Sequence, residues 1–100
     1  MSTDMTCANT ILEQLGGHKF IVMTGAKNFT GTEKTLSFSI MRNTKKVTHV
    51  KITLNWKDLY DIEFMRVHKL KVNPISEAKD VYFDELQRVF TGETGLYTRI

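Results

Sequence analysis

The stretch KTLSFSIMRNTKKVTHVKITLNWKDLYDIEFMRVHKLKV, residues 34–72, decides the fold of this chain. Apolar side chains alternate with polar ones over residues 35–40 and again over residues 49–54. Because a strand has a period of two, each apolar set falls on one face of a sheet. We therefore expect two half-buried strands joined by a short loop at residues 43–45. Trp56 continues the apolar parity of the second strand and is predicted to lie in the core.

A third long strand is expected over residues 59–72. Its alternation is interrupted where Arg66 and His68 occupy positions in line with apolar side chains. One face cannot stay wholly buried through these two residues, so we predict a bulge or a change of parity near Met65. The dipeptide Asn-Pro at residues 73–74 is expected to end the strand.

The segments before this stretch predict a helix, a strand and a loop. Apolar residues at helical spacing, followed by a Gly-Gly pair, predict a helix over residues 5–15. Residues 18–24 carry apolar side chains at both odd and even positions, which suggests an inner strand. Residues 24–32 are expected to form a long loop. Two interpretations remain open for Phe29 in this loop: the ring caps the core, or it is exposed and binds a partner.

The C-terminal part predicts a second helix. Ser76 and Asp80 are candidate N-caps, Leu86 and Phe90 belong to the apolar stripe, and Gly92 is the expected end. The fold class that follows is α+β. We expect a mainly antiparallel sheet of about four strands, with an N-terminal and a C-terminal helix packed on one face.

Length and composition are those of a globular protein. One hundred residues suit a single domain over 1–100. No apolar run approaches the roughly 20 residues of a membrane helix, and the polar residues 1–8 do not resemble a targeting signal. Cys7 is the only cysteine, which excludes an internal disulfide and fits a reducing compartment. These features predict a cytoplasmic protein.

The sequence offers little basis for catalysis or metal binding. Structural zinc sites take their ligands in close pairs, and none of the cysteine and histidine residues lies within four positions of another. These residues are Cys7, His18, His49 and His68. Asp61 and Glu63 share a strand face, where ordinary ion pairs are a simpler role than acid–base chemistry. We expect no metal, no cofactor, no small-molecule substrate and no enzymatic activity.

Charge is distributed unevenly along the chain. The formal net charge is +3, but residues 34–57 hold six basic residues and no acidic one. Residues 77–85 hold four acidic residues against one lysine. A basic two-stranded ribbon fits the major groove of DNA and contacts phosphates. The candidate nucleic-acid-binding residues are Arg42, Lys45, Lys46, Lys51, Lys34 and Lys27.

Two other interpretations of this charge pattern stay open. The lysines near the loop are also what a solvated turn carries to discourage edge-to-edge strand pairing. Alternatively, a lopsided charge favours oriented encounter with a protein partner, either a host enzyme that is inhibited or a second copy in a homodimer.

Three segments carry a resemblance to a known family. They are LGGHKF at residues 15–20, MTGAKNF at residues 23–29 and LYDIEF at residues 59–64. With them, the chain resembles short proteins encoded by bacteriophages, prophages and conjugative plasmids, some of which are labelled ArdK-like transcriptional inhibitor. The resemblance covers nearly the whole chain and defines no functional residues. It implies a mobile-element accessory protein, either a repressor of early genes or a factor that acts against host defence.

Overall fold

The structure, a computed structural model, describes residues 6–41, 43 and 45–96. It consists of helices at both ends of the chain and five strands between them. In chain order the elements are α1 (Thr6–Leu15), α2 (His18–Thr24), β1 (Lys27–Gly31), β2 (Thr35–Ser39), β3 (His49–Leu54), β4 (Tyr60–His68), β5 (Lys71–Val81), the 3₁₀ turn η1 (Phe83–Glu85) and α3 (Leu86–Thr94). The α+β class and the helix over residues 5–15 are confirmed, with a fifth strand and a third helix beyond those expected.

The five strands form one antiparallel sheet in the order β1-β2-β3-β4-β5. Every strand therefore pairs with the next strand of the sequence. Phe38 on β2 lies opposite Val50 on β3, and Val50 lies opposite Phe64 on β4. This register brings the apolar residues of the predicted alternation onto one face, as a period of two requires.

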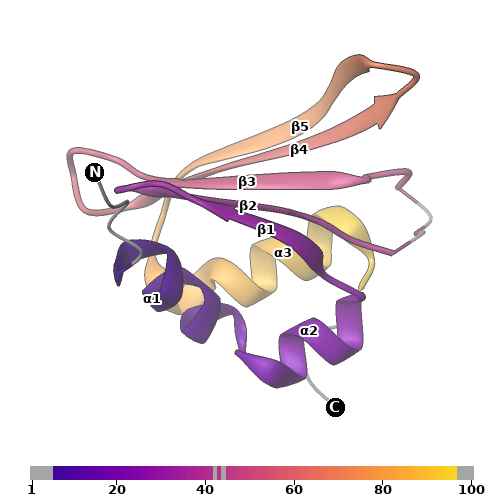
Figure 1. Ribbon diagram of the computed structural model, residues 1–100. Helices are drawn as coiled ribbons and strands as arrows, with labels where there is room; N and C mark the ends of the chain where they lie inside the picture. The colour runs from indigo at the N-terminus through magenta and orange to yellow at the C-terminus, as the bar shows by residue number, and fades with distance from the viewer. Residues whose placement is uncertain (1–5, 42, 44, 97–100) are drawn as a thin grey trace.

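All three helices cover that apolar face (Figure 1). Phe20 of α2, Phe38 of β2 and Phe90 of α3 meet at the centre of the core. The ring centroids of Phe20 lie 5.4 Å from Phe38 and 5.1 Å from Phe90, both edge to face. Each of the three rings is at most 1% exposed. Their burial contributes about 2–3 kcal/mol per side chain, so this cluster is a principal source of stability.

The prediction of a strand over residues 18–24 is wrong, because these residues form the helix α2. Phe20 and Thr24, one helical turn apart, are both buried. Gly25 follows in the left-handed conformation with φ 66°, and its N–H bonds to the carbonyl of Ile21. Glycines on both sides therefore delimit a two-turn helix, and its packing overrides the β propensity of its apolar residues.

The prediction of a loop over residues 24–32 is also wrong, because β1 occupies most of it. Four of the five β1 residues are exposed, so an edge strand of this kind shows no apolar alternation. Its pairing with β2 is irregular between Lys27 and Thr30, and Asn28 adopts a positive φ of 58°. The Asn28 amide donates to Ser39 Oγ at 3.1 Å, which helps to hold the edge in place.

The predicted third strand is in fact the β4–β5 hairpin. It turns at Lys69 and Leu70, whose φ angles are 49° and 67°. The chain then continues through Pro74, which pairs with Met65 and does not end the strand. A proline is tolerated here because β5 is an edge strand, with no neighbour to receive its missing N–H. The irregularity predicted near Met65 is confirmed, since the register shifts between Phe64 and Met65.

The remaining corrections concern the C-terminal helix and one aromatic residue. Ser76 and Asp80 lie within β5 and do not cap α3, which ends at a left-handed Gly95 and runs past Gly92. Leu86 and Phe90 are buried as predicted.

Trp56 is 85% exposed and does not belong to the core. It lies in the β3–β4 turn, where parity no longer applies, with the Lys57 ammonium 5.3 Å from the ring centroid.

Candidate nucleic-acid interface

The connection between β2 and β3 is longer than the predicted loop and is organised by one side chain. Its ends are held together by the N–H of Ile40, which donates to the carbonyl of Thr48 at 3.0 Å. The Asn43 amide donates to the carbonyls of Met41 and Val47, at 3.0 and 2.7 Å. Asn43 Oδ1 in turn accepts the Val47 N–H at 3.1 Å. A side chain that bonds to nearby backbone in this way fixes the path of a connection without regular structure.

Lys45 and Lys46 follow Asn43 and are exposed. Lys46 has a φ of 62°, and its N–H donates to the Asn43 carbonyl at 3.2 Å. Lys46 therefore takes the left-handed position of this turn, while Asn43 contributes its side chain. Lys45 and Lys46 are therefore exposed lysines next to a backbone hydrogen bond that ties Lys46 to Asn43.

Hydrogen bonds attach this connection to β4. The N–H of Thr48 donates to the Met65 carbonyl at 3.0 Å, and Thr48 Oγ1 accepts the N–H of Val67 at 2.8 Å. These contacts place Lys46 and Arg66 on the same open groove of about 480 Å³. The groove is lined by Ile40, Asn43, Lys46, Val47, Thr48 and Arg66. The polar groups of Asn43 and Thr48 form hydrogen bonds within the protein. Lys46 and Arg66 are the charged residues of the groove.

The β4–β5 hairpin extends this basic region. Its outer part, residues 66–75, is called the arm below, and it projects beyond the rest of the sheet on the side away from the helices (Figure 1). Arg66, His68, Lys69 and Lys71 lie on the arm and are exposed. The sequence has no acidic residue between Glu63 and Glu77. The arm therefore carries positive charge without local compensation.

We define the basic end of the molecule as Lys45, Lys46, Arg66, His68, Lys69 and Lys71. Within residues 6–41, 43 and 45–96, the ion pairs are Lys57 with Asp80 and Arg88 with Glu85. Neither pair involves the basic end. Its charges are therefore exposed to solvent and available to an anionic ligand, and mutual repulsion among them favours such a ligand.

The other predicted contact residues do not all lie at this end. Lys34 is at the opposite end of the β2–β3 hairpin, where its carbonyl accepts the N–H of Leu54 at 2.7 Å. Lys51 is in the middle of β3, directly opposite Glu63. Lys27 begins the edge strand β1. Of the six predicted residues, the structure thus places Lys45 and Lys46 together, whereas Arg42 lies outside the described residues.

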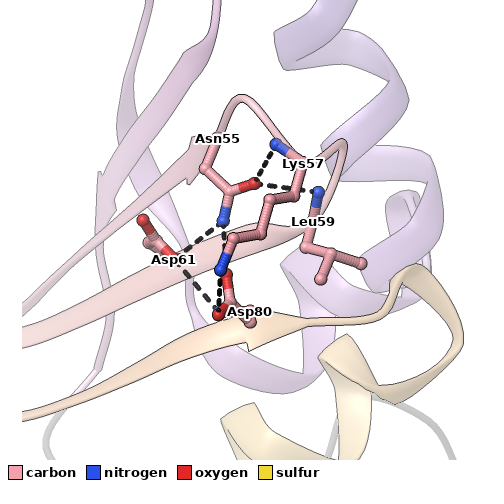
Figure 2. Close-up of polar contacts among 5 residues, drawn as sticks. All are labelled: Asn55, Lys57, Leu59, Asp61 and Asp80. Atoms are coloured by element: carbon pink, nitrogen blue, oxygen red, sulfur yellow. Dashed lines mark hydrogen bonds and ion pairs between the residues drawn. The ribbon is translucent and has the colours of Figure 1, made fainter.

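A polar network occupies the β3–β4 turn (Figure 2), at the end of β3 opposite to the β2–β3 connection (Figure 1). Asn55 Oδ1 accepts the N–H groups of Lys57 and Leu59 at 2.9 and 3.2 Å. Asn55 Nδ2 donates to Asp61 at 3.1 Å and to Asp80 at 2.9 Å. The N–H of Asp80 also donates to Asp61, at 3.1 Å. One asparagine thereby joins the turn to β4 and β5.

Lys57 completes this network by an ion pair with Asp80 at 3.0 Å. The hydrogen bond from the Lys57 ammonium is the main cause that lowers the pKa of the Asp80 carboxyl from its ordinary value of 3.8. Partial desolvation acts in the opposite direction, and the charge of Lys57 and the Asn55 hydrogen bond reinforce the lowering. Lys57 is therefore neutralised locally, unlike the lysines of the basic end.

Phe29 shows the packing expected of a residue that caps the core. Its ring centroid lies 5.5 Å from that of Phe38, and the side chain is 37% exposed. The ring thus contributes to the fold through Phe38, and a role in partner binding remains a prediction.

Sequence reasoning missed the arm, which contributes Arg66, His68, Lys69 and Lys71. The signal was present, since four basic residues fall within six positions and no acid lies nearby. The sequence does not indicate a hairpin here, because residues 69–70 lack the Asn-Gly or Gly-rich pattern that is typical of a tight turn.

Comparison with known proteins gives no match, whether to family models, to curated proteins or to solved structures. Among the described residues, no three His, Cys, Asp or Glu side chains gather into a group that could hold a metal ion. None of the helices described here has the length and apolar character needed to cross a membrane.

Proposed function

We propose that this protein is a non-enzymatic DNA-binding regulator that contacts the phosphate backbone through its basic end. The observation that supports this most is the meeting of two basic segments, the β2–β3 connection and the arm, at one end of the sheet. Hydrogen bonds of Thr48 to β4 hold the two together. An exposed group of cations without paired acids among the described residues suits a polyanion, because each neutralised phosphate releases condensed counterions.

The shape of this end also favours a nucleic acid. The arm is a two-stranded antiparallel ribbon, and such a ribbon has the dimensions of a DNA groove. Lys46 and Arg66 line the open groove of the protein that lies beside the arm. The ribbon would lie along the duplex, while the β2–β3 connection would contact phosphates at its margin.

The biological setting is proposed from the resemblance alone. Segments 15–20, 23–29 and 59–64 resemble accessory proteins of bacteriophages and plasmids. A transcriptional inhibitor acting in the cytoplasm of a bacterial host is the form of DNA-binding regulator that this resemblance favours.

A salt series tests the proposal. Binding to an end-labelled, random-sequence duplex of about 25 base pairs would be measured by fluorescence anisotropy at increasing NaCl concentrations. The slope of log K, the association constant, against log salt concentration falls in magnitude by about 0.9 for each phosphate contact that is removed. The double variant Lys45→Gln, Lys46→Gln should flatten the slope by up to about 1.8. The matched control Lys19→Gln, Lys79→Gln removes two exposed lysines elsewhere, on α2 and β5, and should leave the slope unchanged.

Absence of binding by the unmodified protein at low salt would refute the proposal, as would equal slopes for the two double variants. In that case the alternative of a protein partner would gain support. Sedimentation at several protein concentrations would then reveal a homodimer, and capture of one host enzyme whose activity the protein inhibits would reveal an inhibitor.

A further inference from the structure

The tip of the arm carries a leucine in an unusual setting. Leu70 has a relative exposure of 101%, so its side chain makes no contact that shields it. Its φ of 67° lies in the left-handed region, as does the φ of 49° at Lys69. His68 pairs with Lys71 to close this two-residue turn. Turns of this kind strongly favour Asn-Gly or Asp-Gly, since β-carbon atoms are crowded there.

Leu70 therefore contributes to the fold neither through burial nor through a relaxed backbone. A strained residue that is also an exposed apolar one is typical of a site selected for contact with a ligand. Val72 and Ile75 on the same arm are 60% and 41% exposed. The arm thus presents an apolar tip with further apolar side chains behind it.

The charges around Leu70 identify the kind of ligand. Lys69 and Lys71 are its immediate neighbours, and Arg66 and His68 precede them on β4. The nearest acidic residues in the sequence are Glu63 and Glu77, seven positions away on either side. A protein pocket for this leucine would also have to accept the cations Arg66, Lys69 and Lys71, whereas a DNA groove offers phosphates on both margins.

We propose that the arm enters a groove of duplex DNA and that Leu70 inserts between adjacent base pairs as an apolar wedge. Lys69 and Lys71 then lie at the phosphates on either side, and the duplex kinks at the inserted step. Wedges of Leu, Phe, Ile, Met or Pro act in this way in proteins that bend DNA, by about 20–90°. The inference rests on the proposed DNA binding and adds a defined deformation to it.

The substitution Leu70→Asn tests the role of Leu70 in DNA bending without disturbing the fold. Asparagine tolerates the left-handed backbone better than leucine does, so the Tm of the variant should equal or exceed that of the unmodified protein. Lys69 and Lys71 stay in place, so affinity for a random-sequence duplex at low salt should change by less than about tenfold. Bending should be lost, because the inserted side chain is gone.

Bending is measured by energy transfer between dyes at the two ends of the same duplex, at protein concentrations that saturate the anisotropy signal. The control Val22→Gln removes a side chain that is 63% exposed on α2, away from the arm, and should bend DNA like the unmodified protein. We expect higher transfer for the unmodified protein and the control than for free DNA, and transfer close to that of free DNA for Leu70→Asn.

Two results would overturn the wedge while leaving DNA binding intact: a duplex that binds the unmodified protein and stays straight, or a Leu70→Asn variant that bends as strongly as the unmodified protein. Failure of the underlying function looks different, because no anisotropy change would then occur even at low salt. The proposed insertion of Leu70 would then be refuted together with DNA binding, and the arm would be assigned to contact with a protein.

Discussion

The hydroxyl oxygen of Thr48 accepts the backbone N–H of Val67 at 2.8 Å, across 19 residues of sequence. The same hydroxyl lies 2.8 Å from His49 Nδ1. Thr48 is half-buried, so the Val67 N–H would have no equivalent partner without it. Together with the backbone bond from Thr48 N–H to the Met65 carbonyl, this side chain attaches the β2–β3 connection to the base of the arm.

Thr48→Val should lower the free energy of unfolding by about 1–3 kcal/mol, because a partly buried donor loses its acceptor. Thr48→Ser keeps the oxygen and should cost less than half as much. Urea titration gives the free energies, and hydrogen exchange at the Val67 amide should accelerate in Thr48→Val only. Equal exchange rates in the two variants would show that this bond does not hold the arm.

Lys34 and Lys51 should contribute little to DNA binding, although the sequence placed them in the interface. Lys34 is at the far end of the β2–β3 hairpin, and Lys51 faces Glu63 across the ladder. Lys34→Gln and Lys51→Gln should each leave the salt slope within about 0.3 of the unmodified value, whereas Arg66→Gln should reduce it by up to about 0.9. A loss at Lys51 as large as that at Arg66 would move the interface onto the open sheet face.

Phe90→Ala should destabilise the protein by about 3–5 kcal/mol, since it leaves a cavity beside Phe20 and Phe38. Phe83→Ala is the matched control, because Phe83 is 61% exposed in the adjoining η1 turn. Its cost should be below about 1 kcal/mol. Thermal unfolding followed by circular dichroism compares the two. Similar costs would mean that α3 does not pack through Phe90.

Asp80 should make stability depend on pH in the acid range. Its pKa is lower in the folded protein than the ordinary value of 3.8, so the folded state binds the proton less readily than the unfolded chain. The stabilisation is therefore complete above pH 3.8 and is lost as the pH falls through the folded pKa. Asp80→Asn should be less stable than the unmodified protein at pH 7, and the difference should shrink at pH 3.

Urea midpoints at pH 7, 5 and 3 measure this effect. Glu33→Gln serves as the control, because Glu33 is exposed in the β1–β2 turn and makes no ion pair within the described part of the chain. Its midpoint should follow that of the unmodified protein at each pH. A gap between Asp80→Asn and the unmodified protein that stays constant from pH 7 to pH 3 would contradict the assignment.

The sequence predicted the centre of the fold because burial there follows a simple period. Leu36, Phe38, Val50 and Ile52 alternate with polar residues, and all four are buried. The α1 stripe was equally clear, with Ile11 and Leu15 fully buried. Where one face of an element is covered and the other is not, periodicity is sufficient to place it.

The misplaced elements are those in which local propensity and tertiary packing disagree. Residues 18–24 are rich in β-forming side chains, yet α2 packs Phe20 against Phe90. The β1 strand is exposed and has no alternation to detect. The turn at Lys69 and Leu70 lacks turn-forming residues, so the sequence predicts a single strand where the structure has a hairpin. That error also concealed the arm, which carries four of the six residues of the basic end.

The position of Pro74 on β5 has a further consequence. β5 is the last strand in the sheet order, and its ladder to β4 is irregular at two places. A proline without an N–H, together with these irregularities, makes the outer border a poor template for another chain. Lateral sheet growth through β5 is thereby discouraged, so the long ribbon can stay extended without polymerising through its outer edge.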